Sequence, residues 1–358
     1  MRRRWRIPVA AATTLLVMAV GAVWWRSRPP AFRPPASVSA LAREIDRTVP
    51  ASLRAHRVPG ASVAVVHRGR VVWTGAYGAA DERTPMRPDT VMQVASVSKT
   101  VAAYALVRLA GAGTLPLDAP IERFTGTWRL PASRFDARAV TLRRLLSHTA
   151  GLNVDGYPGL APDVPVPSTR ASLDGASGVG KVRIVDEPGS GWRYSGGGYT
   201  VAQLAAETAT GRPFAEIVER EVLRPAEMTR TGFTCDGVAR GHDGTGAPVP
   251  RYRFAEQAAG GLCSTAPDLA RFSALLMRGG PVAHAMGVPA AATDGSYGLG
   301  LHTERTRDGG RRLWHDGSNR GWRSRIEVFP DDGWALVVLT NGDHGNDVIA
   351  DVRRLILR

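Results

Sequence analysis

Ser96-Val97-Ser98-Lys99 begins an apolar run that extends to Ala110 and is followed by Gly111 and Gly113. An apolar run closed by glycines is typical of a helix. Positions i and i+3 of a helix lie on one face, so the Ser96 hydroxyl and the Lys99 amine meet one turn apart. The stretch therefore predicts a nucleophile beside a base at the start of a helix.

Lysine is rare in this chain, which makes its position here informative. The chain has 46 lysines and arginines, of which only Lys99 and Lys181 are lysines. An arginine keeps its proton in a protein, whereas a partly desolvated lysine can lose it and act as a base. The alternative interpretation is an exposed helix lysine beside a capping serine.

The composition is that of a globular protein. The chain has 358 residues, of which 44% are hydrophobic and 22% charged, and this excludes disordered and fibrous classes. The net charge of +14 comes from scattered arginines, without the mixture of basic and aromatic residues that a nucleic-acid groove has. We expect no nucleic-acid partner and interpret the charge as typical of a protein at the cell envelope.

Two cysteines, Cys235 and Cys263, are the only ones in the chain. They can form one disulfide in an oxidising compartment or remain two buried thiols in a reducing one, and the sequence leaves both open. Neither has the spacing of a zinc site, so no metal and no cofactor are expected.

The N-terminal segment has the pattern of a membrane-directing sequence. Residues 1–6 carry four arginines, residues 7–25 are uncharged, and the proline-rich residues 26–37 resemble an extended tether. We expect 1–6 to be cytoplasmic, 7–25 to be a transmembrane anchor, and the domain of residues 38–358 to be extracytoplasmic at the cell membrane. The alternative for 7–25 is a cleaved signal peptide, which makes the protein secreted.

The remaining pattern predicts an α+β fold. A helix that Pro50 disturbs is expected near residue 40, and the β-branched runs 61–66 and 71–77 predict a hairpin through Arg68-Gly69. Helical patterns follow within a lobe of about residues 96–255, and again at 266–277 and in the last residues, where Ile349, Val352 and Ile356 share a face. Four further strands are expected at 297–302, 311–314, 322–329 and 334–340. We therefore expect an antiparallel sheet built from both ends of the chain, flanked by helices, with an inserted helical lobe.

Five ordered motifs resemble one known family. They are Ser96-Val97-Ser98-Lys99, residues 145–152 with Ser147-His148-Thr149, Tyr194-Ser195-Gly196, Gly260-Gly261-Leu262 and His315-Asp316-Gly317. The chain resembles the serine β-lactamase-like hydrolases, which include class C β-lactamases, D-alanyl-D-alanine carboxypeptidases and related esterases. The resemblance covers residues 40–358 and implies a β-lactamase/transpeptidase-like fold.

The resemblance also implies roles for single residues. Ser96 is the nucleophile, and Tyr194 with Lys99 takes and returns its proton. Charged Lys99 is expected to favour the phenolate form of Tyr194. His315 takes the place of the lysine that many β-lactamases have, and it is expected to be a catalytic residue that orients a leaving group or binds a carboxylate. The backbone N–H groups of Ser96 and Ser318 form the oxyanion hole.

Further residues are expected around this centre. Gly317, Asn319 and Arg323 are candidate substrate-binding residues. One of the two arginines here, Arg320 or Arg323, is suited to a substrate carboxylate. We interpret His148 as structural. The proline-rich loop of residues 153–175 is expected to border the cleft.

The chain departs from the family pattern at Gly196, where β-lactamases usually have asparagine. The loss of that side chain favours an ester-cleaving or promiscuous hydrolase over an efficient β-lactamase. We expect a serine hydrolase that forms an acyl-enzyme with a small-molecule or peptidoglycan-derived ester or amide. The alternatives are a penicillin-binding module that acylates without efficient turnover and an envelope scaffold without the chemistry.

Overall fold

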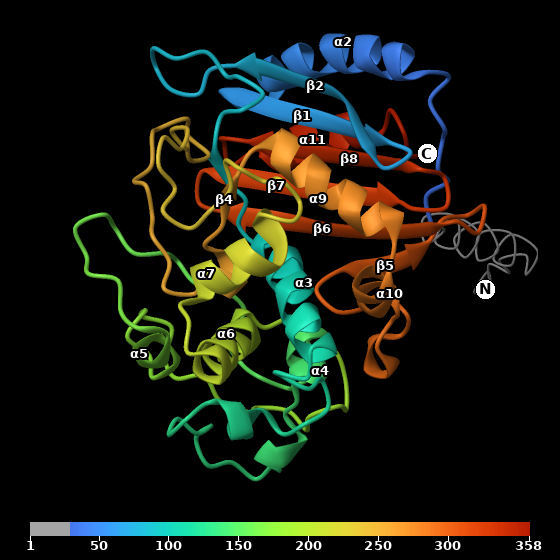
Figure 1. Ribbon diagram of the computed structural model, residues 1–358. Coiled ribbons are helices and arrows are strands. Elements are labelled where there is room, and N and C mark those ends of the chain that lie inside the picture. Colours follow the sequence, from blue (N-terminus) through green and yellow to red (C-terminus); the bar gives the residue numbers. More distant parts are fainter. Residues whose placement is uncertain (1–28) are drawn as a thin grey trace, which may run out of the picture.

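Strand β1, near the beginning of the domain, pairs with β8, near its end, and this pairing joins the two halves of one sheet. The computed structural model describes residues 29–358. Its six-stranded antiparallel sheet has the order β2-β1-β8-β7-β6-β5 (Figure 1). The strands are β1 (Gly60–His67), β2 (Arg70–Gly78), β5 (His302–Arg305), β6 (Arg311–Asn319), β7 (Trp322–Phe329) and β8 (Trp334–Thr340). The predicted sheet from both ends of the chain is confirmed.

Both faces of the central strands are buried, which explains their continuous apolar sequence. Val63 and Val65 of β1 pack beneath the helices α2 (Val38–His56) and α11 (Gly345–Arg353). The alternate residues Ala64 and Val66 belong to the large core on the opposite face. On that face α9 (Ala266–Arg278) crosses the sheet (Figure 1).

The helical lobe lies on the same side of the sheet as α9. Its helix α3 (Val97–Gly111) extends into the lobe from the sheet (Figure 1). Almost every side chain of α3 is buried, so its apolar residues surround the whole helix instead of forming one stripe. The other helices of this part are α4 (Leu142–Leu146), α5 (Thr169–Leu173), α6 (Gly196–Thr210), α7 (Phe214–Val218), α8 (Gln257–Gly260) and α10 (Pro281–Gly287). Single turns are η1 (Ile121–Phe124), η2 (Ala137–Ala139), the π-turn η3 (Glu219–Leu223) and η4 (Ala291–Thr293).

The structure corrects three local expectations. Pro50 lies inside α2, which continues without interruption to His56. The segment 297–302 is not a strand as a whole, because β5 begins at His302. Ile356 is buried with Val352, yet it follows the end of α11.

A second, two-stranded sheet supports the start of α3. It pairs β3 (Met92–Gln93) with β4 (Cys263–Ser264). Cys263 is bonded to Cys235, which decides between the disulfide and the two thiols that the sequence left open.

The expected membrane anchor at residues 7–25 lies outside the described residues. Within residues 29–358, the structure has no helix with the length and apolar character needed to span a membrane.

Candidate active site

The side chain of Ser96 stands at a tight turn between β3 and α3. Ala95, the residue before it, has a φ of 47°, a left-handed conformation that costs energy in a residue with a Cβ. Strand β6 packs against this turn so closely that a Cβ at Gly317 would lie 2.3 Å from the carbonyl oxygen of Val94. Glycine is therefore required at 317, and the close packing brings Ser318 to the start of α3.

Lys99 occupies the next turn of α3, as the spacing predicts. Its Nζ donates a hydrogen bond to Ser96 Oγ at 3.1 Å and another to the carbonyl oxygen of Ala259 at 2.6 Å. The side chain is only 2% exposed, and this burial lowers the pKa of Lys99 to about 7, although Asp316 opposes the shift. A large fraction of Lys99 is therefore neutral near pH 7 and able to accept a proton.

Tyr194 interacts with the Ser96 side chain. It comes directly before Ser195, whose side chain caps α6 by accepting from the N–H of Gly198. Lys99 Nζ lies 4.9 Å from the centre of the Tyr194 ring. Burial raises the pKa of Tyr194, and a hydrogen bond with the Ser96 side chain only partly offsets the rise. The expected phenolate is therefore wrong. Burial favours the uncharged form of both groups, because it raises the pKa of Tyr194 and lowers the pKa of Lys99, so Tyr194 is a neutral phenol.

Two buried histidines accompany these residues. His148 accepts a hydrogen bond from the N–H of Ser195 at 3.1 Å, and its ring packs on Tyr194 with 4.3 Å between centres. His315 donates from Nδ1 to the carbonyl oxygen of Asp316 at 2.5 Å. Burial lowers the pKa of both imidazoles well below the usual value, so both are neutral. His148 thus supports Tyr194, in agreement with the structural role that the sequence indicates.

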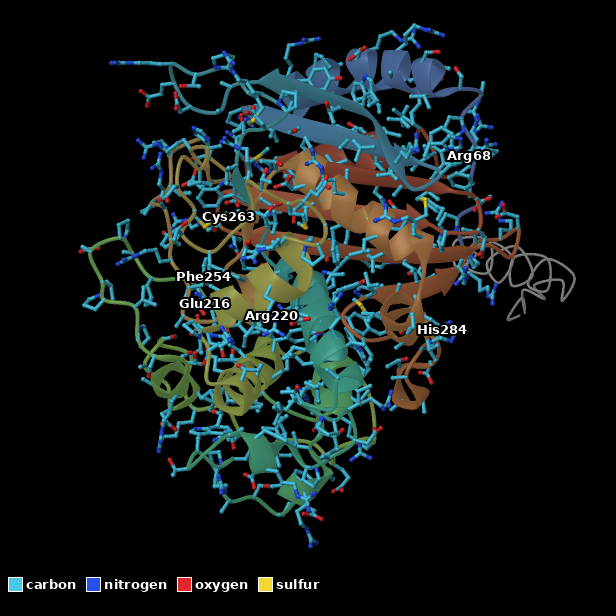
Figure 2. All side chains as sticks on the ribbon, viewed as in Figure 1. Arg68, Glu216, Arg220, Phe254, Cys263 and His284 are labelled. Carbon is cyan, nitrogen blue, oxygen red and sulfur yellow. A yellow bond between two sulfur atoms is a disulfide. The ribbon has the colours of Figure 1, made fainter. Side chains whose placement is uncertain are left out.

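A narrow cavity of about 60 Å³ opens above Ser96. Its lining combines the nucleophile and amine with residues of β6, α8 and the expected cleft loop: Ser96, Lys99, Gly156, Tyr157, Phe254, Ala259, Gly260, Ser318 and Asn319. Phe254 also lines a wider hollow of about 560 Å³, which continues past Gln93 and Cys235. Figure 2 shows Phe254 and Cys263 on the same side of the molecule.

The structure brings most of the predicted site residues together. Ser96, Lys99, Ser318 and Asn319 line the cavity, and within residues 29–358 no group accepts a hydrogen bond from the Ser96 N–H. Tyr194, His315 and Gly317 are not among the residues that line it.

The structure does not bring Arg323 to the cavity. Its guanidinium contacts Asp343 at 2.9 Å and donates to the carbonyl oxygen of Asn319. A carboxylate-binding role therefore has no support from its position, because the charge already has a partner.

Sequence reasoning missed two residues of the site. Tyr157 lines the cavity and shares a hydrogen bond with Thr200 at 2.9 Å. Gln93 contacts Asn319 from behind. The only signal for Gln93 was a polar residue inside the apolar segment that precedes Ser96.

The place of the missing side chain at Gly196 is filled by the cleft loop. A Cβ there would lie 3.0 Å from the carbonyl oxygen of Asp155 and 3.4 Å from the Tyr157 ring. The Gly196 N–H donates to that same carbonyl oxygen at 3.1 Å. A longer side chain at position 196 would therefore meet Asp155 and Tyr157 of this loop. Among residues 29–358 no group of three or more potential metal ligands is gathered in one place.

Comparison with known proteins shows which sequences and structures the chain resembles. A family model described as Beta-lactamase matches residues 45–358. The chain is 33% identical over 225 residues to esterase EstB of Burkholderia gladioli, which is 59% of this chain and 57% of that protein. It is 28% identical over 323 residues to the D-aminopeptidase of Brucella anthropi, which is 82% of this chain and 58% of that protein.

The chain thus spans less than two thirds of the length of these two curated relatives. A crystal structure of a D-stereospecific amidohydrolase from Streptomyces sp. superimposes with a TM-score of 0.70 at 25% identity, covering 86% of this chain and 97% of that one.

Proposed function

Because the chain belongs to the Beta-lactamase family, we propose that it is a serine hydrolase that cleaves an ester or amide through an acyl-enzyme on Ser96. The observation that carries the proposal is the 3.1 Å hydrogen bond between Lys99 Nζ and Ser96 Oγ, made by an amine with a pKa of about 7. A base with a pKa near the working pH is the most effective proton acceptor.

The first step is acylation. Neutral Lys99 takes the proton as Ser96 Oγ attacks the substrate carbonyl carbon, and the N–H groups of Ser96 and Ser318 stabilise the oxyanion. The Tyr194 phenol, hydrogen-bonded to Ser96, relays a proton to the leaving alcohol or amine, and Lys99 restores the proton of the phenol. In the second step water attacks the acyl-enzyme along the same proton route and releases the acid.

The cavity and the relatives support a proposal for the substrate class. The relatives are an esterase and a D-aminopeptidase, and the structural neighbour is a D-stereospecific amidohydrolase. The loop around Tyr157 fills the space next to Gly196, which leaves the narrow cavity suited to a small acyl group at Ser96. We favour small esters and amides over bulky β-lactams for this reason.

Labelling with a fluorophosphonate tests the nucleophile. Wild-type protein is expected to gain one label, mapped by mass spectrometry to the peptide that contains Ser96, and Ser96→Ala is expected to gain none. Ser190→Ala, which removes an exposed serine, is the matched control and keeps the label. Equal labelling of wild type and Ser96→Ala contradicts the proposal.

A penicillin-binding module that acylates without turnover is the second candidate, because the nucleophile and amine are in place while the family's asparagine is absent at Gly196. Stopped-flow measurement of p-nitrophenol release separates the two. An enzyme shows a burst followed by steady release, whereas a module shows one equivalent and then stops.

We further propose that the domain works outside the reducing cytoplasm, because disulfides such as Cys235–Cys263 persist in oxidising compartments. A difference in gel mobility between reduced and non-reduced protein taken directly from cells supports this location. Identical mobility in cells, with the difference present only after purification, contradicts it.

A further inference from the structure

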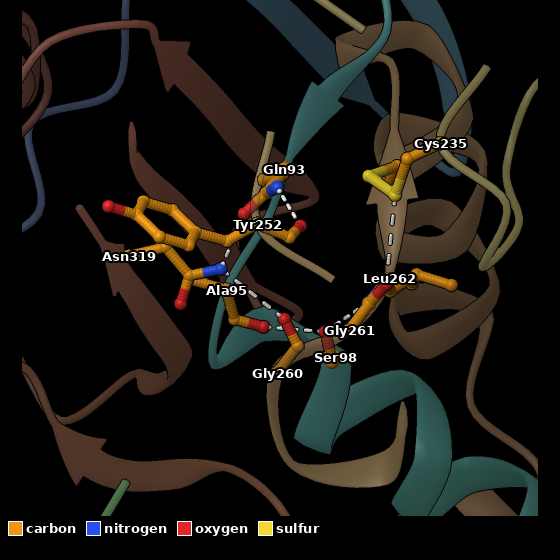
Figure 3. Close-up of a disulfide and its surroundings, with 10 residues drawn as sticks. Gln93, Ala95, Ser98, Cys235, Tyr252, Gly260, Gly261, Leu262 and Asn319 are labelled. Carbon is orange, nitrogen blue, oxygen red and sulfur yellow. Dashed lines mark hydrogen bonds between the residues drawn. A yellow bond between two sulfur atoms is a disulfide. The ribbon is translucent and has the colours of Figure 1, made fainter. Parts of the chain in front are cut away.

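Two side-chain amides meet beside the cavity, one from each sheet. Gln93 ends β3 and Asn319 ends β6. Asn319 Nδ2 donates to Gln93 Oε1 at 2.8 Å, and Gln93 Nε2 donates to the carbonyl oxygen of Tyr252 at 2.9 Å (Figure 3). Asn319 Nδ2 also faces the carbonyl oxygen of Gly260 at 3.4 Å.

This chain of contacts fixes which end of each amide points where. The Tyr252 carbonyl can only accept, so Gln93 must present its NH₂ group there and its oxygen to Asn319. Asn319 must then present its own NH₂ group to Gln93. Gln93 is only 3% exposed, and turning its amide over would place two acceptors against each other at Tyr252 and two donors against each other at Asn319.

The consequence is that Asn319 Oδ1 is directed away from Gln93, on the side of the cavity. Asn319 lines that cavity together with Ser96 and Gly260. A Cβ built on Gly260 would lie 3.9 Å from Oδ1, so the oxygen stands over Gly260. Within the described part of the chain no donor is hydrogen-bonded to Oδ1, which leaves it free to accept from a ligand.

The charges around the cavity favour an uncharged donor on that ligand. Lys99 is the only cation in the lining, and its hydrogen bonds go to Ser96 and Ala259. Arg323 is paired with Asp343, and Arg320 lies between Asp243 at 3.7 Å and the Tyr252 hydroxyl at 3.3 Å. Neither Arg320 nor Arg323 is therefore free for a substrate carboxylate, and a substrate ammonium is repelled by Lys99 whenever that amine is charged.

We propose that Asn319 determines specificity by accepting a hydrogen bond from an N–H group on the acyl part of the substrate, so that the preferred substrates are esters or amides of N-acylated amino acids. The proposal rests on the serine hydrolase function described above. Gln93 acts through Asn319 and is a positioning residue. A substrate without the N–H leaves Oδ1 unpaired when the cavity fills, which lowers kcat/KM.

Three p-nitrophenyl esters that differ in one group test this. They are the esters of N-acetylglycine, of 4-oxopentanoic acid and of acetoxyacetic acid, in which NH is replaced by CH₂ and by O. Because the three esters differ in intrinsic reactivity, each kcat/KM is divided by the rate constant for alkaline hydrolysis of the same ester. We expect this corrected kcat/KM to be about tenfold higher for the NH ester than for the CH₂ ester, the size of one hydrogen bond to a buried acceptor. The O ester is expected to be poorest, since two acceptors then face each other.

Variants link the preference to the two amides. Asn319→Ala is expected to bring the NH/CH₂ ratio close to one, and Gln93→Leu to lower it because the Asn319 amide is then free to turn. Asn346→Ala, which removes an exposed amide on α11, is the matched control and keeps the wild-type ratio.

The outcomes separate this proposal from the one on which it rests. A wild-type ratio near one, or a ratio that Asn319→Ala leaves unchanged, overturns the specificity role while hydrolysis persists. If no ester is cleaved faster by wild type than by Ser96→Ala, the hydrolase function itself fails. If Asn319→Ala does not fold, the order of the corrected kcat/KM values of the wild type still decides. An acceptor at Asn319 requires the NH ester to be the best substrate and the O ester the poorest, and any other order overturns the proposal.

Discussion

Lys99 Nζ lies 3.1 Å from Ser96 Oγ, and the same nitrogen donates to the carbonyl oxygen of Ala259 at 2.6 Å. The amine is thus held between the nucleophile and a backbone acceptor on α8, a helix that lies about 160 residues later in the chain. One contact is local to α3 and the other is tertiary. Together they place a buried amine where it can receive the serine proton.

The pH dependence of hydrolysis is expected to follow Lys99. Its pKa of about 7 is lowered by burial, so the neutral, base-competent form increases as the pH rises through 7. We expect kcat/KM to rise between about pH 6 and 8 with one apparent pKa near 7, measured with an uncharged p-nitrophenyl ester. A rate that falls over this range contradicts the role of Lys99 as base.

Replacement of the amine tests the same point. Lys99→Met keeps the length of the side chain and is expected to lower kcat by roughly 10²–10⁴-fold, the usual contribution of a general base. Lys181→Met, which alters the other, exposed lysine, is the matched control and keeps wild-type rates.

Loss of the Tyr194 hydroxyl is expected to slow the reaction with little effect on stability. Tyr194→Phe keeps the ring that packs on His148 and removes the phenol that relays the proton. We expect kcat to fall roughly 10²-fold or more, and most for substrates with poor leaving groups, because these need protonation. Tyr104→Phe, at a buried tyrosine on α3, serves as control. Equal loss for p-nitrophenyl and alkyl esters would argue against proton delivery to the leaving group.

Restoring the family's asparagine at Gly196 is expected to destabilise the protein. Its Cβ would lie 3.0 Å from the Asp155 carbonyl oxygen, and the side chain would displace Tyr157. We expect Gly196→Asn to lose about 1–3 kcal/mol in denaturant unfolding, as overpacked sites do. Gly196→Ala, which adds only the Cβ, is expected to lose less. A fully stable Gly196→Asn protein that hydrolyses cephalosporins would show that the loop moves aside easily.

Removal of the disulfide is expected to lower stability through the unfolded state. The Cys235–Cys263 bond closes a loop of 28 residues, which corresponds to about 3–4 kcal/mol of loop-closure entropy. The double variant Cys235→Ser, Cys263→Ser should show this loss in urea unfolding, and reduced wild type should match it. Because β4 carries Cys263 and pairs with β3 before Ser96, we also expect a lower kcat. Unchanged stability and activity would make the bond incidental.

Much of this architecture could be predicted from residue patterns because the relevant spacings are local. The helix from Val97 and the strands β7 and β8 follow from apolar runs bounded by glycine and turn residues, and the Ser96–Lys99 pair follows from one helical turn. The expected disturbance of the helix at Pro50 does not occur, because packing of α2 on the sheet outweighs the local cost of a proline.

A sequence pattern does not show the surroundings that distant elements create around a residue. The pKa of Lys99 depends on its burial beneath α8 and β6, and the neutral state of Tyr194 has the same cause. Arg323 is paired with Asp343, which lies 20 residues later in the chain. The acceptor that Asn319 directs to the cavity depends on the Tyr252 carbonyl, which fixes the amide of Gln93. Periodicity reports the neighbours along one element, whereas charge state and hydrogen-bond polarity depend on groups that only folding brings within contact.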